Sequence, residues 1–266
     1  MNKCENEMLD LLKKLRQEFG AVSVKAEFEA EGTRKDELLR LIDLGRRAGL
    51  QVGLKIGGCE AVRDLLESKQ FGVEYIIAPM VETPYALKKF IEAKNKVYSL
   101  EQQEYTDFLF NLETITTFNA LDELVNVAKY EGGVEGIVFG RVDFAGSNNL
   151  SRSDIDSDNI TKYIVATAEA CKKHKLDLVV GGAVCIDSLP ELRKVKEVHL
   201  TRFETRKVIF SADALDIATI NHGLELTVYF ELLWLRNKRD YYNAIKHEDN
   251  NRIAMLEQRW EQIRGA

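Results

Sequence analysis

The sequence is poor in residues that interrupt helices and strands, and it has no long hydrophobic run. Only three prolines occur in 266 residues, and no low-complexity linker divides the chain. No segment approaches the roughly 18 consecutive apolar residues of a membrane-spanning helix, and the charged N-terminus lacks the apolar core of a signal peptide. We therefore expect a cytoplasmic protein without a membrane partner.

Cysteine and excess positive charge are also scarce. The four cysteines (Cys4, Cys59, Cys171 and Cys185) are widely spaced without a C-x-x-C pair, which indicates reduced thiols rather than a disulfide framework or a zinc site. A net charge of −6 without a long basic run argues against a dedicated nucleic-acid surface.

Short β-rich runs alternate with amphipathic helical stretches along most of the chain. The predicted strands are 21–29, 50–57, 74–81, 107–113, 136–143, 177–184 and 198–204. The predicted helices are 5–19, 34–48, 59–70, 84–95, 117–131, 159–174 and 188–195. Regular alternation predicts a parallel sheet in the α/β class, and seven strands approach the count of a TIM-type (β/α)8 barrel.

The pattern changes after residue 210, so we divide the chain into a barrel domain over 1–210 and C-terminal helices over 211–266. A helix start at Ser211 precedes an apolar stretch, and a charged segment over 236–251 leads to a last helix carrying Trp260. These helices exceed what the last turn of a barrel needs. Both extra packing on the barrel and a dimerising or subunit-exchanging arm explain them.

Charged residues alternate along one side of the first strand, where Lys25, Glu27 and Glu29 share a face. The helix-covered side should be apolar, so this charged side is predicted to face the barrel interior or its mouth, together with Lys55 and Asn111. Charges in a small lumen are costly unless they pair, bind a metal or bind substrate. A structural ion-pair network is one explanation, and an active site is the better one.

Two carboxylates, Glu113 and Asp143, lie at the predicted ends of consecutive strands. Acidic side chains at the carboxyl ends of neighbouring parallel strands converge on one mouth, where oxygen ligands can hold a hard divalent cation. The alternative is that the two residues only cap their strands.

Several segments together resemble the HpcH/HpaI aldolase and citrate lyase β-subunit family of metal-dependent, pyruvate-type aldolases. Tyr75-Ile-Ile-Ala-Pro-Met-Val-Glu-Thr83 is similar to its Pro-Met-Val strand end. Leu112-Glu-Thr114, followed by Ala120-Leu-Asp-Glu-Leu124, resembles its Ile-Glu-Thr strand and following helix. Gly140-Arg-Val-Asp-Phe-Ala-Gly-Ser147 is similar to its Gly-x-x-Asp loop. The resemblance covers roughly residues 20–210.

The resemblance implies a lyase that forms or cleaves a carbon–carbon bond through the enolate of a 2-oxo acid or an acyl thioester. Glu113 and Asp143 would hold Mg²⁺ or Mn²⁺, which acts as a Lewis acid on the substrate. Backbone N–H groups of the loop formed by Gly140, Arg141, Val142 and Asp143 would bind the substrate carboxylate.

The chain departs from the family pattern at the groups that bind the anion and move the proton. Lys55 stands where the family has an arginine, and lysine cannot supply the bidentate fork. Arg141 is our candidate for the missing guanidinium. Glu29 falls in the acid position, while Ala30 replaces the usual histidine base. We therefore assign proton transfer to Glu29 or to a metal-bound hydroxide.

The chain also begins close to the family's first barrel helix, so its first strand is missing from the pattern. We expect a second subunit to complete the site or to shield the open edge. A homo-oligomer formed through the C-terminal helices would meet that need.

Two other functions stay open. Lys55 could act as a Schiff-base nucleophile if its apolar, glycine-lined setting lowers its pKa. Alternatively, the missing arginine and histidine reflect lost catalysis, and the chain is a non-catalytic binding or assembly barrel.

Overall fold

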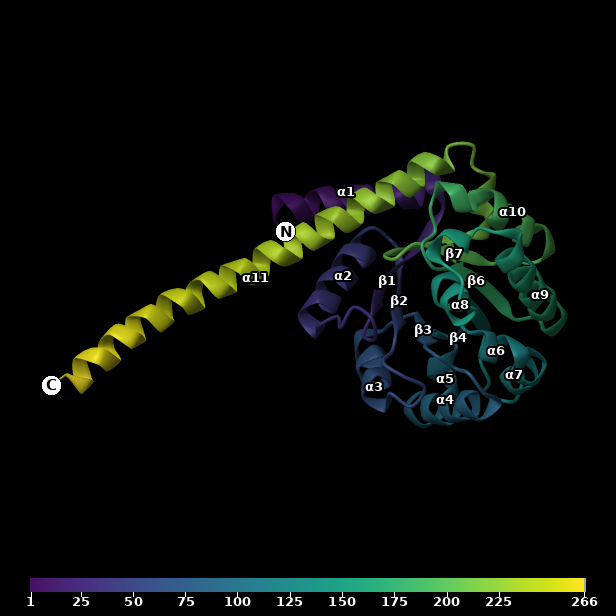
Figure 1. Ribbon diagram of the computed structural model, residues 1–266, viewed down its shortest axis with the longest axis horizontal. Helices are drawn as coiled ribbons and strands as arrows, with labels where there is room; N and C mark the ends of the chain where they lie inside the picture. Colours follow the sequence, from purple (N-terminus) through teal and green to yellow (C-terminus); the bar gives the residue numbers. More distant parts are fainter. Residues whose placement is uncertain (266) are drawn as a thin grey trace.

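Eight strands close into one barrel in sequence order (Figure 1), in a computed structural model that describes residues 1–265. The strands are β1 (Ala21–Glu27), β2 (Gln51–Lys55), β3 (Tyr75–Ala78), β4 (Asp107–Leu112), β5 (Gly136–Gly140), β6 (Asp177–Gly181), β7 (Arg202–Glu204) and β8 (Val208–Ser211). The predicted TIM-type barrel is confirmed, although several predicted strands run past the observed ends.

The strand missing from the sequence pattern is replaced by β8, which runs against its neighbours. Strands β1 to β7 pair in parallel, whereas β8 is antiparallel to both β7 and β1. The chain reverses at Thr205, whose backbone N–H donates to the carbonyl of Val208. The expectation of an open barrel edge was therefore wrong, because a hairpin within the same chain closes it.

Helices surround the barrel and connect the successive parallel strands β1 to β7. They are α1 (Lys3–Phe19), α2 (Lys35–Arg47), α3 (Val62–Phe71), α4 (Pro84–Val97), α5 (Leu100–Gln103), α6 (Ile115–Asn119), α7 (Leu121–Ala128), α8 (Arg141–Ser147), α9 (Asp158–His174), α10 (Leu189–Val198) and α11 (Ile220–Arg264), with short 3-10 turns η1 (Arg152–Asp154), η2 (Ile186–Ser188) and η3 (Ala212–Asp216). Helix α8 occupies residues that the sequence predicted as the end of a strand.

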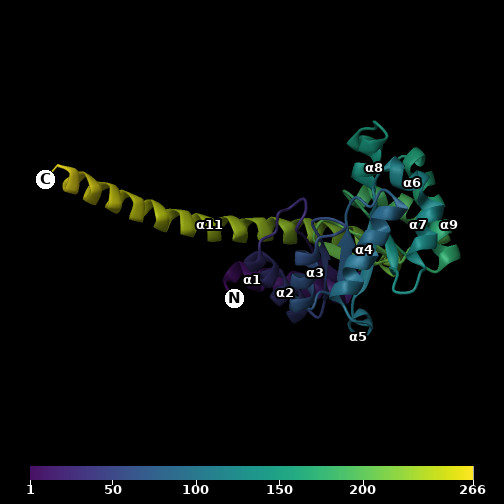
Figure 2. The ribbon, with the colours of Figure 1, turned by 90° about the horizontal axis from the view of Figure 1, so that it is seen from below.

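The C-terminal region is one continuous helix rather than the separate helices expected from the sequence. After the barrel ends at Ser211 and the turn η3, α11 extends over 45 residues. Neither glycine nor proline occurs between Leu224 and Arg264, so nothing interrupts helical hydrogen bonding in the charged segment. Its first half packs beside α1, and the rest projects away from the barrel (Figures 1 and 2).

The barrel interior has an apolar layer between two polar ends. The apolar layer consists of Tyr75, Ile77, Leu109, Val138 and Val179. At the amino ends of the strands, Arg202 pairs with Asp177 at 2.8 Å and with Asp107 at 3.5 Å. The polar groups at the carboxyl ends form the candidate site.

Among residues 1–265, no helix combines the length and the apolar character needed to cross a membrane.

Candidate active site

A cavity of about 520 Å³ opens at the carboxyl ends of the barrel strands. Its lining includes the predicted interior residues Lys25, Glu27, Lys55 and Asn111, so the prediction that these polar side chains face the lumen or its mouth is confirmed. Thr227 and Val228 of α11 also line it, which places the start of the long helix at the mouth of the cavity.

Glu113 lies at the inner wall of this cavity, one residue after β4, and is almost completely buried. Its Oε1 accepts the backbone N–H of Met80 at 3.0 Å, and its Oε2 accepts Asn111 Nδ2 at 2.5 Å. Met80 adopts a left-handed backbone conformation (φ 48°), which is costly for a side chain larger than glycine. The local structure thus holds this carboxylate in a fixed orientation.

Asp143 lines the same cavity but from a different kind of element. Strand β5 ends at Gly140, and Asp143 belongs to the first turn of α8, where it is exposed. Ser147, at the end of the same helix, accepts the N–H of Ile115 at 2.9 Å, which fixes α8 to the segment after Glu113. The two predicted metal ligands therefore face one cavity, from a strand end and from a helix start.

Lys55, the last residue of β2, is buried between two of the cavity carboxylates. Its Nζ lies 3.1 Å from Glu29 Oε2 and 3.4 Å from Glu113 Oε2. Burial alone would lower the pKa of Lys55, but Glu113 and Glu29 together raise it above its ordinary value. The ammonium form is stabilised, which disfavours Lys55 as a Schiff-base nucleophile in this environment.

Glu29 and Ala30 lie in the turn after β1, at the rim of the cavity. Glu29 Oε2 is buried, and its only close cation within residues 1–265 is Lys55. None of the four histidines is among the residues lining this cavity in the described chain. His199, predicted on a strand, instead follows α10 and contacts the carbonyl of Leu176. Glu29 is thus the side chain at the position where the base was predicted.

Arg141 does not reach the cavity, so the structure does not support the expected role of its guanidinium. The side chain is 1% exposed and turns away, where it binds Asp156 and donates to the carbonyls of Gly181 and Gly182. Its neighbours Gly140 and Val142 do line the cavity. Arg141 therefore ties α8 to the end of β6, and only its backbone remains available to a ligand.

Two site residues escaped the sequence reasoning as a pair, namely Lys25 and Glu204. Lys25 Nζ lies 2.5 Å from Glu204 Oε1 and 3.2 Å from Glu27 Oε1. Burial opposes the charge of Lys25, but Glu204 and Glu27 raise its pKa well above the ordinary value. The alternation on β1 indicated Lys25, whereas β7 is too short to indicate which way Glu204 points.

Two adjacent glycines make room for the deepest carboxylates. Gly140 and Gly181 are register partners on β5 and β6. A Cβ on Gly140 would lie 2.9 Å from Glu113 Cβ, and one on Gly181 would lie 2.8 Å from Glu204 Oε1. Any larger residue at either position would displace a carboxylate, so both glycines are needed for the shape of the site.

The cavity has an excess of negative charge and unsatisfied acceptors. Six carboxylates line it against two lysines and two arginines. Asn111 Oδ1 and Glu204 Oε2 are buried without a hydrogen-bond donor, and such atoms call for a cation or a donor from a ligand or water.

These groups fit a divalent cation held by few protein ligands. The described residues contain no cluster of three or more His, Cys, Asp or Glu side chains spaced for a metal. Mg²⁺ commonly uses one or two carboxylates and fills its other positions with substrate and water. Glu113 and Asp143, with the unpartnered Asn111 oxygen nearby, match that sparse ligand set.

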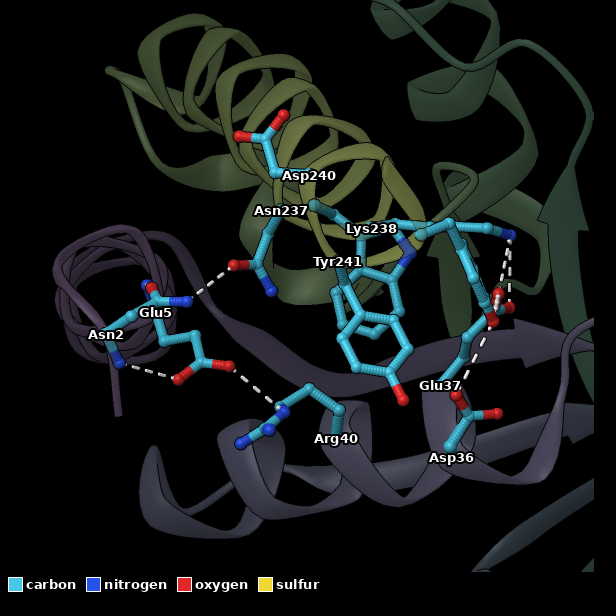
Figure 3. A pocket seen from close by; sticks show the side chains of 11 residues that line it. Asn2, Glu5, Asp36, Glu37, Arg40, Asn237, Lys238, Asp240 and Tyr241 are labelled. Atoms are coloured by element: carbon cyan, nitrogen blue, oxygen red, sulfur yellow. Dashed lines mark hydrogen bonds and ion pairs between the residues drawn. The ribbon is translucent and has the colours of Figure 1, made fainter. Parts of the chain in front are cut away.

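A second crevice, of about 370 Å³, lies between α1, α2 and α11 (Figure 3). Two of its acidic side chains are already paired: Glu5 contacts Arg40 at 3.0 Å, and Glu37 contacts Lys238 at 3.0 Å. Asn237 accepts a hydrogen bond from Asn2. These contacts fix the long helix to the barrel, and the crevice lacks the unsatisfied acceptors of the barrel mouth.

Comparison by sequence gives no relatives: no family model matches the chain, and no curated protein matches it.

Comparison by structure shows the fold. An HpcH/HpaI aldolase from Desulfitobacterium hafniense superimposes with a TM-score of 0.56 at 12% identity, over 78% of this chain and 92% of that one. An HpcH/HpaI aldolase/citrate lyase family protein from Burkholderia cenocepacia gives 0.54 at 11% identity, over 81% and 98%. A variant of the citrate synthase SbnG gives 0.51 at 12% identity, over 82% and 96%. The chain thus has the fold of the family that its motifs resemble.

Proposed function

We propose that the protein is a divalent-metal-dependent carbon–carbon lyase or aldolase acting on a 2-oxo acid such as pyruvate, or on an acyl thioester. The observation that carries the proposal is that Glu113, Asp143 and Lys55 line one cavity at the carboxyl end of a barrel with this fold. Fold alone does not define chemistry, so the proposal depends on this combination of side chains.

Glu113 and Asp143 would hold Mg²⁺ or Mn²⁺, which supplies Lewis acidity toward the 2-oxo group when bound. Lys55 would place its ammonium beside the substrate carboxylate or the developing enolate oxygen, which stabilises negative charge. The first N–H groups of α8, at Arg141 and Val142, have no partner within the helix and would donate to the same carboxylate.

Glu29 would move the proton. In the synthetic direction, it removes a proton from the methyl carbon of pyruvate, and that carbon forms a bond to the carbonyl carbon of an aldehyde. The proton ends on the former aldehyde oxygen, so no other reactant is consumed. The ion pair with Lys55 at 3.1 Å orients the Glu29 carboxylate toward the cavity.

Hydrogen–deuterium exchange at the pyruvate methyl group, followed by NMR in D₂O, tests the proposal without knowledge of the second substrate. We expect exchange with Mg²⁺ or Mn²⁺ and its loss in excess EDTA. If exchange survives EDTA and borohydride traps the substrate on Lys55, a Schiff-base mechanism replaces the metal mechanism. Absence of exchange and of acyl-thioester cleavage under all metal conditions would indicate a non-catalytic binding barrel.

We also propose that the projecting part of α11 joins two copies of this chain. Every residue from Asn243 to Arg264 is exposed. Ile253, Leu256, Trp260 and Ile263 repeat at heptad spacing and are 52–62% exposed. Most helical stability in proteins comes from the packing of an apolar face rather than from helix propensity, so a partner helix would stabilise this segment.

Light scattering after size-exclusion chromatography tests the oligomer. The full chain should have at least twice the mass of the single chain, and Leu256→Ser with Trp260→Ser should reduce it. Exposed polar positions on the same helix, such as Gln258→Ser, provide the matched control. A monomeric full chain would overturn the proposal.

We place this assembly in the cytoplasm, as the free cysteines suggest.

A further inference from the structure

One feature of the cavity has no role in the proposed reaction, namely the pair formed by Lys25 and Glu204. In this pair a hydrogen-bond donor and an acceptor lie side by side. Both residues are more than nine-tenths buried, at 6% and 4% exposure. Glu204 Oε1 accepts from Lys25, but Glu204 Oε2 is buried without any donor. A buried carboxylate oxygen without a donor costs free energy, which a ligand hydrogen bond would recover.

Lys25 also keeps part of its hydrogen-bonding capacity. An ammonium group has three N–H donors, and the contacts of Lys25 Nζ are Glu204 Oε1 and Glu27 Oε1. A group bound beside this pair would meet a donor from Lys25 and an acceptor from Glu204. A hydroxyl group provides both complementary functions at one atom, whereas an ammonium only donates and a carboxylate only accepts.

The pair lies close to the reaction site but is separate from it. Glu113 packs against Gly140, and Glu204 packs against Gly181. These glycines are register partners on neighbouring strands, which lie about 4.8 Å apart. One small substrate can therefore span the distance from the groups around Glu113 to Glu204.

We propose that Glu204 and Lys25 form a subsite that recognises a hydroxyl group on the aldehyde that accepts the enolate. The inference rests on the proposed function and adds the specificity of the second substrate. In this arrangement the hydroxyl donates to Glu204 Oε2 and accepts from Lys25 Nζ. The enzyme would therefore discriminate against an aldehyde of the same carbon skeleton that lacks the hydroxyl.

The test compares propanal, 2-hydroxypropanal and 3-hydroxypropanal as acceptors for pyruvate, with kcat/KM measured for each. One hydroxylated aldehyde should exceed propanal by about 10- to 100-fold, because a hydrogen bond to a charged group is at stake. Glu204→Gln places an amide donor where the free acceptor was, and this ratio should fall to within about threefold of unity. Glu197→Gln, on the exposed face of α10, is the matched control and should retain the ratio.

Pyruvate methyl exchange in the same preparations separates the possible failures. Wild-type exchange without any preference among the aldehydes would overturn the subsite, leaving water as the partner of Glu204, and would leave the proposed function intact. Absence of exchange and of aldol product in the wild type would overturn both. If Glu204→Gln lowers exchange and all three aldehyde rates equally, the pair is only structural and the inference is wrong. Should Glu204→Gln fail to fold by circular dichroism, Glu204→Asp and the wild-type ratio decide the question.

Discussion

The two ends of the barrel both contain buried charges, but they satisfy them differently. At the amino ends of the strands, Arg202 is shared by Asp107 and Asp177 and its guanidinium stacks over the ring of Tyr75. At the carboxyl ends, carboxylates outnumber cations, and the acceptors of Glu204 and Asn111 lack donors. A network in which the charges are paired is typical of a structural role, whereas a network with unpaired groups is typical of a binding site. Mutations at the two ends should therefore affect different properties.

The largest expected effect comes from Glu113 at the carboxyl end. Glu113→Gln should lower metal-dependent pyruvate exchange about 100-fold or more, because the change removes a negative ligand while retaining the shape. NMR exchange rates with Mn²⁺ measure this effect. The counterpart Asp107→Asn at the amino end should leave the exchange rate unchanged. Equal losses in both variants would contradict the division between the two ends.

The next effect concerns stability at the amino end. Arg202→Met should lower the free energy of unfolding by about 2 kcal/mol, because it leaves Asp107 and Asp177 without their cation. The loss should be smaller than for a fully buried pair, since these carboxylates are 43% and 38% exposed. Urea unfolding measures it. The rate of pyruvate exchange per folded molecule should be unaffected. A large catalytic loss would refute the structural role assigned to Arg202 and its two partners.

A smaller effect is expected at Lys55. Lys55→Met should raise the KM for pyruvate about 10-fold, because the variant loses an ammonium partner for the substrate carboxylate. Lys55→Arg should recover part of that loss by restoring the positive charge. Steady-state kinetics of the aldol reaction measure both variants. A Lys55→Met enzyme with wild-type KM and kcat would remove Lys55 from the site.

The last prediction concerns the pH dependence of stability. Burial lowers the pKa of Lys94 to about 8, although Glu135 acts in the opposite direction. The folded state then binds fewer protons than the unfolded state, so this group's destabilising contribution is full below pH 8. It disappears as pH rises toward the unfolded pKa of about 10.4. Stability of the wild type relative to Lys94→Met should therefore increase over that range, by on the order of 1 kcal/mol for each unit of pKa difference.

Thermal or urea unfolding of both proteins at pH 7.5 and 10 checks the sign. The comparison with Lys94→Met cancels the titration of other lysines and tyrosines. A difference that stays constant or reverses would show that Lys94 keeps its ordinary pKa in the folded protein.

The sequence predicted the barrel because its longer strands and helices carry clear periodicities. Alternation on the first strand directed Lys25 and Glu27 into the lumen, and the strand ends directed Lys55 and Glu113 to the same mouth. Side chains on one face of a strand, and the carboxyl ends of parallel strands, converge in any such fold. These placements needed no information about distant contacts.

Short elements and element boundaries depended on the tertiary structure. Strand β8 has four residues and β7 has three, too few for a periodic signal, so the closure by a hairpin and the inward direction of Glu204 were hidden. The information that was missing is the pairing with the neighbouring strand, which forms only in the folded barrel.

The residue at which β5 ends determines the direction in which the Arg141 side chain points. If the strand continued to Asp143, Arg141 and Asp143 would share one face with a period of two. The change to a helical period at Gly140 separates them, so that Asp143 lines the cavity and Arg141 turns toward Gly181. The sequence by itself therefore determined which residues reach the barrel mouth along regular strands. Only tertiary packing decided where each strand stops, and with it which charges pair and which remain free for a ligand.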